Sequence, residues 1–364
     1  MDSNTLKPLR IGNLTAQLPI IQGGMGVCIS LAGLASAVAN EGGIGVIATA
    51  VIGMSEPDYF SNLAAADIKA LRREIRKARG LTKGILGVNI MVALSNYVDL
   101  VRTSVEEGID IIFSGGGLPL NLPRYLEGSQ KTKLVPIISS GRAAALIARR
   151  WMDKYNHCPD AVVVEGPLAG GHLGFKPQDI ENPDFNLDKL VPEVIEEMKK
   201  IDAECGRHIP IVAAGGVYTG GDIYKYMNRL GADGVQMATR FVTTTECDAS
   251  KEFKDAYINS KKEDVVIIES PVGMPGRAIK NVFIDDVNKG NKKPFKCPYH
   301  CIKTCDVINA PYCIALALVN AQRGNLKDGF AFAGGNVYRT DKVIPVKELV
   351  KTLREEYRQA SSGK

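Results

Sequence analysis

The feature that most constrains the fold of this chain is a set of eight short apolar runs in its first 241 residues. Each run is rich in Ile and Val and is continuous rather than alternating. Such a pattern is typical of strands that are buried on both faces, as in a parallel sheet. The runs cover residues 18–23, 44–49, 84–92, 109–114, 134–139, 161–165, 209–215 and 234–241.

Segments with helical patterns lie between these runs, and several of them end at glycine, which often terminates a helix. We expect helices at residues 31–42, 57–78, 96–108, 141–155, 187–204 and 221–232. Strands and helices that alternate in this way predict an α/β fold, a (β/α)8 TIM barrel. A doubly wound open sheet is the competing architecture, but it usually has fewer strands per domain.

The regular alternation stops near residue 262. We therefore expect residues 1–261 to form the barrel core and residues 262–330 to form a C-terminal insertion that packs on it. Residues 331–364 are predicted to close the chain against the barrel. Helical patterns recur within these parts at residues 312–324 and 346–359.

Composition excludes several classes of function. The net charge of +5 is small and dispersed, so it does not indicate nucleic-acid binding. No apolar run reaches the roughly 18 residues that span a membrane, and the first residues lack the apolar segment of a secretory signal. We predict a cytoplasmic protein that acts on a small molecule, without nucleic-acid or membrane partners, and the sequence is compatible with an oligomer.

Glycine-rich turns follow several of the predicted strands, at the end of the barrel where active sites form. Gly23, Gly24 and Met25 lie at and just after the end of the first run, Gly215-Gly216 lies at the end of the seventh, and Gln236, Met237, Ala238 and Thr239 lie within the eighth. The loops after the last two strands are the usual phosphate site of this fold. Backbone N–H groups and the Thr239 hydroxyl can bind an anion there, which indicates a phosphorylated cofactor or substrate.

His172 lies in a glycine-rich loop directly after the sixth run, preceded by Gly170 and Gly171. Small neighbours leave room for a flat ligand, and an imidazole suits proton transfer near neutral pH. A catalytic role is therefore favoured over that of an ordinary loop histidine. Glu165 ends the sixth run and either pairs with a base or binds the cofactor. Asn89 either caps a turn or hydrogen-bonds a ring system.

The other histidines differ from His172 in position. His157 and His208 lie between helices and the strands that follow them, at the opposite end of the barrel. We interpret both as structural.

Five motifs together resemble the FMN-dependent nitronate monooxygenase family, which shares a superfamily with the flavin-dependent enoyl-ACP reductases. They are PIIQGGMG (19–26), GVNIMV (87–92), VEGPLAGGHLG (164–174), IPIVAAGGV (209–217) and GADGVQMATRFVTTTE (231–246), and GRAIKN (276–281) is similar to a stretch found in both groups. The resemblance implies a TIM barrel with one FMN. It places the FMN phosphate at Gly215, Gly216, Ala238 and Thr239, and His172 matches the catalytic histidine. The flavin would be lined by Gly24, Met25, Asn89, Glu165, Gly170 and Gly171.

Two positions depart from the family pattern. Residue 165 is Glu where monooxygenases often have Gln, and residue 238 is Ala where Gly is usual. Neither change removes FMN binding, although Glu165 would bring negative charge near the flavin.

The resemblance predicts an FMN-dependent oxidoreductase that converts alkyl nitronates to a carbonyl compound and nitrite, with His172 as base or orienting group. The alternative is an NAD(P)H-dependent reductase of enoyl thioesters, with an acyl thioester or acyl carrier protein as partner. A non-catalytic barrel that binds a phosphorylated ligand is the remote alternative.

Four cysteines are crowded outside the core resemblance, at Cys297, Cys301, Cys305 and Cys313, with His300 among them. Four thiolates could hold an iron–sulfur cluster or zinc, and i, i+4 spacing would gather three of them on one face of a helix. Free thiols and disulfides are the other interpretations. An iron–sulfur cluster would favour the reductase.

Overall fold

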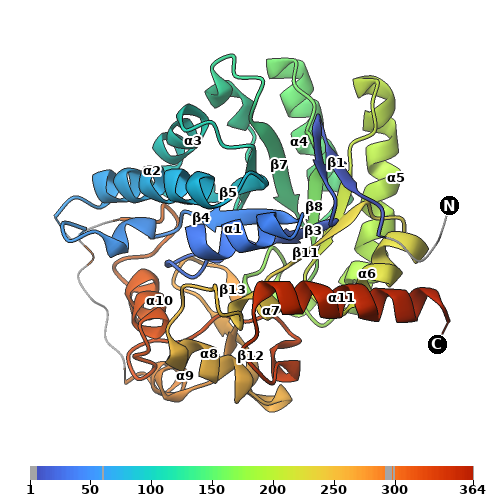
Figure 1. Ribbon diagram of the computed structural model, residues 1–364. Helices are drawn as coiled ribbons and strands as arrows, with labels where there is room; N and C mark the ends of the chain where they lie inside the picture. The colour runs from blue at the N-terminus through green and yellow to red at the C-terminus, as the bar shows by residue number, and fades with distance from the viewer. Residues whose placement is uncertain (1–5, 60, 292–296, 298–299, 364) are drawn as a thin grey trace.

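The computed structural model describes residues 6–59, 61–291, 297 and 300–363. It confirms the predicted barrel: the parallel strands close in the order β10-β11-β3-β4-β5-β6-β7-β8 (Figure 1). The strands are β3 (Ile20–Gln22), β4 (Ile44–Ala48), β5 (Ile85–Met91), β6 (Ile111–Gly115), β7 (Lys133–Ile138), β8 (Val162–Glu165), β10 (Ile211–Ala214) and β11 (Gly234–Met237).

The barrel helices follow the predicted segments, except that α2 starts later and the last predicted strand is shorter. They are α1 (Ala32–Asn40), α2 (Leu63–Leu81), α3 (Tyr97–Glu106), α4 (Gly141–Tyr155), α5 (Leu187–Cys205) and α6 (Gly220–Tyr224), the last continued by a π-helical turn. Helix α2 begins later than expected because the Asn62 side chain caps it, accepting from the Ala65 N–H. The eighth apolar run is not all strand, since α7 (Thr239–Val242) starts two residues after β11 ends.

A short hairpin lies against the apolar interior of the barrel. Strands β1 (Leu9–Ile11) and β2 (Leu14–Ala16) pair antiparallel, and Leu9 and Ile11 pack with Ile21, Val163 and other inward-facing strand residues. The outward-facing neighbours of those residues, such as Val162 and Val164, belong to the outer core instead. Both faces of the strands are therefore buried, which explains the continuous apolar runs.

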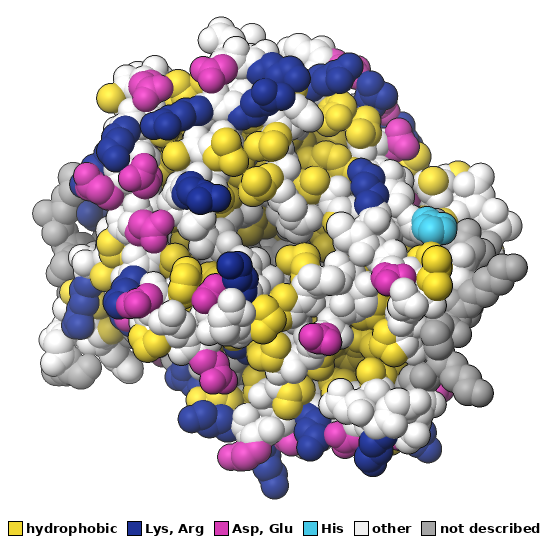
Figure 2. All heavy atoms as spheres, turned by 180° about the vertical axis from the view of Figure 1, so that it is seen from behind, with side chains coloured by type: hydrophobic (Ala, Val, Ile, Leu, Met, Phe, Trp, Pro, Cys, Tyr) yellow, Lys and Arg dark blue, Asp and Glu magenta, His cyan; other side chains and the backbone are white. Residues whose placement is uncertain are grey.

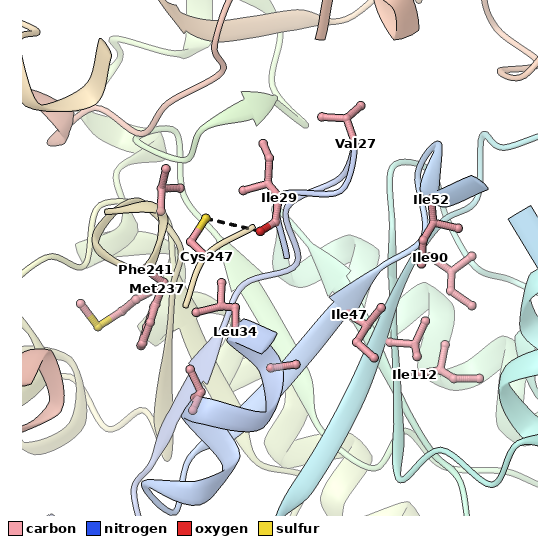
Figure 3. Close-up of a cluster of buried hydrophobic side chains, with 14 of the residues drawn as sticks. Val27, Ile29, Leu34, Ile47, Ile52, Ile90, Ile112, Met237, Phe241 and Cys247 are labelled. Carbon is pink, nitrogen blue, oxygen red and sulfur yellow. Dashed lines mark hydrogen bonds between the residues drawn. The ribbon is translucent and has the colours of Figure 1, made fainter. Parts of the chain in front are cut away.

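The outer core joins the strands to the surrounding helices (Figure 3). Leu34 on α1, Ile47 on β4 and Met237 on β11 are buried there together with Phe241. The thiol of Cys247 lies in the same region and donates to the Ile29 carbonyl, 3.4 Å away.

The described residues between 251 and 340 form a second layer, shown in yellow to orange-red in Figure 1. Its helices are α8 (Lys251–Ile258), α9 (Val282–Asn288) and α10 (Ile314–Gln322), whereas the last helix, α11 (Val346–Ser361), packs against the barrel helices α6 and α1. Strands β12 (Val265–Glu269) and β13 (Pro275–Ile279) form a sheet with the two-residue strand β9 (Gly171–His172) from the barrel. Helix α11 packs against α6, where the Gly220 N–H donates to the Glu356 carboxylate over 2.6 Å.

Cys158 and Cys205 form a disulfide. Cys158 precedes β8 and Cys205 ends α5, and their Cα atoms lie 6.2 Å apart. The described helices include none that is long and apolar enough to cross a membrane.

Candidate active site at the barrel mouth

A sheet between the barrel and the C-terminal layer holds the loop with His172 in place. In this sheet Gly276 pairs with His172 and Arg277 with Gly171, and the Leu173 N–H donates to the Pro275 carbonyl at 2.9 Å. The GRAIKN motif (276–281) therefore contributes the strand that positions the histidine. This contact joins segments more than 100 residues apart.

His172 has one polar and one aromatic neighbour. Its Nε2 lies 2.7 Å from the Ser270 hydroxyl, and its ring meets Phe332 edge to face with centroids 5.0 Å apart. Burial lowers the pKa of His172 to about 4, so the imidazole is neutral at physiological pH. Ser270 and Phe332 were missed from the sequence, which has no local signal linking them to His172.

Arg277 forms hydrogen bonds with the backbone of the loop that leads to His172. Its buried guanidinium donates to the carbonyls of Pro167 and Ala169, the latter at 2.9 Å. Burial lowers the pKa of Arg277 from its usual value, partly offset by Glu181. The charged side chain thus fixes the backbone that leads to His172.

Two further predicted residues border the mouth with side chains that form no hydrogen bond within the described part of the chain. Glu165 ends β8, and burial raises the pKa of its carboxyl to about 7. Asn89 lies within β5 rather than at its end, because that strand continues to Met91. Gly24 packs so closely on Asn89 that a Cβ would lie 2.4 Å from the Asn89 Cβ. Glycine is therefore required at this contact.

The loops after β10 and β11 form a candidate anion-binding site, which we call the cradle. Gly216 has a φ of +104°, and α7 begins directly after Ala238. Among the described residues, no acceptor is found for the N–H groups of Gly216 and Ala238. These donors, with the Thr239 hydroxyl beside them, fit the phosphate of FMN.

A segment that the sequence prediction overlooked closes this cradle. Residues 333–336 (Ala-Gly-Gly-Asn) lie on it: the Asn336 amide donates to the Gly216 carbonyl at 2.7 Å, and the Gly335 N–H donates to the Leu168 carbonyl at 2.9 Å. A Cβ at Gly334 would lie 2.7 Å from the Thr239 hydroxyl. The adjacent glycines were the available signal, because they allow this close approach.

The remaining predicted positions are held by hydrogen bonds of their backbone N–H groups. The Gly23 N–H donates to the Met237 carbonyl at 2.8 Å, and the Met25 N–H donates to the Ser30 hydroxyl at 3.0 Å. Gln236 precedes Met237 on β11, and the Met237 side chain belongs to the outer core. Figure 2 shows one face of the molecule with a hollow near its middle and hydrophobic side chains gathered around it.

The other histidines have structural partners. His208 bridges the carboxylates of Asp202 and Asp233, at 2.8 and 3.1 Å. His157 lies 3.7 Å from Asp160 and packs on Trp151. Both precede barrel strands, at the end opposite the mouth.

The crowded cysteines line a common pocket, but not on one helix face as predicted. The described residues between 300 and 313 form turns, and the helix begins only after Cys313. The pocket is lined by Cys297, His300, Cys301, Ile302, Cys305, Val307, Ala310, Tyr312, Cys313 and Ile314. Among the described residues, no three His, Cys, Asp or Glu side chains surround one metal ion.

Comparison with known proteins identifies the family. The family model described as nitronate monooxygenase matches residues 7–356. The chain belongs to the nitronate monooxygenase family. A probable nitronate monooxygenase of Staphylococcus haemolyticus is 27% identical over 78% of this chain and 81% of its own length. A 5-hydroxy-7a-methyl-1-oxo-octahydro-1H-indene-4-carboxyl-CoA dehydrogenase of Mycobacterium tuberculosis is 28% identical over 75% of this chain and 66% of its own length.

The solved structures agree with this assignment. The structure of FabK from Thermotoga maritima has a TM-score of 0.72 and 26% identity, and the match covers 95% of this chain and 94% of that one. Family membership and the barrel together make this family member an FMN-dependent oxidoreductase.

Proposed function

We propose that the protein oxidises alkyl nitronates to a carbonyl compound and nitrite, with FMN held at the barrel mouth. The observation that supports this most directly is a neutral, partly buried His172 in a loop of small residues on the rim that holds the anion cradle. Bound FMN would supply the redox chemistry by accepting electrons from the substrate and returning them to oxygen.

The cradle would hold the FMN phosphate through the N–H groups of Gly216 and Ala238 and the Thr239 hydroxyl. Glycines at the mouth would leave the flavin ring room to lie close to the backbone. The predicted contacts are Gly23, Gly24, Met25, Asn89, Glu165, Gly170, Gly171, Gly215, Gln236 and Met237, and for Met237 the backbone is the group that faces the mouth.

His172 would act on the substrate through the ring nitrogen that does not face Ser270. If Nε2–H donates to the Ser270 hydroxyl, Nδ1 keeps its lone pair and can take a proton from a neutral nitroalkane. The imidazolium that results would then stabilise the nitronate anion. The low pKa of His172 keeps this base unprotonated at neutral pH, and the nitronate anion that forms beside it would stabilise the protonated imidazolium.

A second candidate is NAD(P)H-dependent reduction of an enoyl thioester. The mycobacterial relative is named for a CoA thioester substrate, and the likeness to FabK covers nearly the whole chain. In this reaction Nδ1 of His172 would carry the proton and donate a hydrogen bond to the thioester carbonyl. The acyl chain would be presented by coenzyme A or by an acyl carrier protein.

Anaerobic mixing of FMN-loaded protein with ethyl nitronate, NADH, NADPH or crotonyl-CoA separates the two reactions. Bleaching of the flavin absorbance by the nitronate, with carbonyl compound and nitrite formed once oxygen is admitted, is the expected result. Bleaching by a nicotinamide alone, followed by reoxidation with crotonyl-CoA, would replace the proposal by the second candidate.

His172→Asn tests the histidine, with His208→Asn at the far end of the barrel as matched control. We expect kcat/KM to fall by about 100-fold or more in the first variant and to stay unchanged in the second, while both retain FMN. Equal activity of the two variants would contradict the role given to His172.

A further inference from the structure

We propose that Cys297, Cys301, Cys305 and Cys313 bind a [4Fe–4S] cluster beside the active site. This site is additional to the FMN site and does not depend on which substrate the flavin oxidises or reduces. It rests on the chemistry of one pocket, on the contrast with the other free thiols, and on the place of the pocket in the fold.

The pocket wall has the composition of a cluster site. It contains four thiols, while His300 is the other ionisable group and the remaining lining side chains are apolar except for the Tyr312 hydroxyl. Four cysteine thiolates in an apolar shell are the usual ligands of iron–sulfur cubanes. Each thiol would lose its proton as its Fe–S bond forms.

The other free thiols of the chain already have partners. The Cys28 thiol donates to the Ile52 carbonyl at 3.5 Å, and the Cys247 thiol donates to the Ile29 carbonyl at 3.4 Å. Within the described residues, no such acceptor is found for the thiols of Cys301, Cys305 and Cys313. Structural burial explains Cys28 and Cys247, whereas the pocket thiols face one another around a shared space.

A cluster and a single ion place different demands on the four thiols. The four line one pocket, yet no three described His, Cys, Asp or Glu side chains are grouped as the ligands of one metal ion. A cubane has an iron atom at four of its corners, so its thiolates stand farther apart than the ligands of a single zinc ion. Zinc is the other metal predicted from the sequence, and the sulfide content of the protein distinguishes it from a cluster.

The backbone around the thiols is held by contacts with the barrel. Ile302 forms a β-bridge with Leu94, and the Ser95 N–H donates to the Cys301 carbonyl at 3.1 Å. Cys313 directly precedes α10, whose first-turn N–H groups favour a thiolate. Turns and a helix end thus present the thiols to the pocket before any cluster binds.

The same contacts place the pocket on the rim of the active site. Leu94 and Ser95 follow β5, the strand that contains Asn89. On the other side, the Asp306 N–H donates to the Pro271 carbonyl at 3.3 Å, next to the Ser270 that contacts His172. A cluster bound by the neighbouring Cys305 would adjoin the turn that orients the histidine.

The test is anaerobic purification followed by iron, sulfide and zinc analysis and by EPR after dithionite reduction. We expect about four iron and four sulfide per chain, and the EPR signal of a reduced [4Fe–4S] cluster. One zinc per chain without sulfide, or no metal after reconstitution with iron and sulfide, would overturn the proposal.

Single variants then identify the ligands. Cys301→Ser, Cys305→Ser and Cys313→Ser should each lose most of the iron and the EPR signal, whereas the matched control Cys247→Ser should keep both. The FMN content of each variant reports independently whether the barrel is folded. Full iron content in all three pocket variants, with FMN retained, would exclude these cysteines as ligands.

Discussion

Replacing Arg277 with methionine should destabilise the protein by removing hydrogen bonds to the loop after β8, at the mouth of the barrel. The guanidinium is buried and donates to two carbonyls, those of Pro167 and Ala169, in the segment that leads to His172. Methionine keeps much of the apolar volume of the side chain but donates no hydrogen bond. Both carbonyls would then lose their charged partner inside the protein.

The magnitude follows from these two contacts. A hydrogen bond from a charged group stabilises by about 1.5–3 kcal/mol, so two such bonds amount to roughly 3–6 kcal/mol. Part of this gain is spent on burying the charge, which is the cause of the lowered pKa of Arg277, and methionine recovers that part. We expect a net loss of about 2–4 kcal/mol in the free energy of unfolding.

Urea unfolding of the FMN-free protein measures this loss, and fluorescence titration measures FMN affinity. Affinity should fall about tenfold or more, which corresponds to roughly 1.4 kcal/mol, because Gly170 and Gly171 lie on the same loop. Arg102→Met is the matched control, since Arg102 forms an exposed pair with Glu127 at 3.1 Å and should cost less than about 1 kcal/mol. If both variants lose equally little and bind FMN normally, the bracing role of Arg277 is wrong.

Two further substitutions test the mouth. Burial raises the pKa of Glu165 from 4.5 to about 7, so its ionisation costs stability as pH rises from about 4.5 through 7. Glu165→Gln should match the wild type in urea unfolding at about pH 4 and exceed it by about 1–3 kcal/mol at pH 8, and a pH-independent difference would contradict this. Gly216→Val should yield colourless protein that folds but retains no FMN, because valine is strained at a φ of +104° and its Cβ would lie 3.0 Å from the Leu168 Cβ. A yellow variant would argue against the cradle. Gly206→Val, at a helix end away from the mouth, controls for the backbone strain.

Much of the barrel could be predicted because its strands leave a strong local pattern. Val162, Val163 and Val164 are all apolar since one points into the barrel and two point outward into the helix layer. The errors lie where a capping or turning residue changes the local structure, as at Asn62 before α2 and at Ala238 before α7. Hydrophobicity alone does not detect these ends.

The candidate site was predictable only in part. The glycine turns and His172 follow strand ends, so the order of elements placed them on one rim. The residues that orient them come from distant segments: Ser270 and Phe332 contact His172, and Asn336 contacts Gly216. None of these has a sequence spacing that relates it to the residue it contacts.

The barrel, and the rim that carries the glycine turns, Glu165 and His172, follow from the order of the short buried segments and from the residues at which they end. How that rim is completed depends on the folded chain. The pairing of β13 with the His172 strand, the burial of Arg277 and the gathering of four thiols in one pocket all depend on contacts between distant segments. Such contacts are set by packing in three dimensions, and no local pattern of residues encodes them.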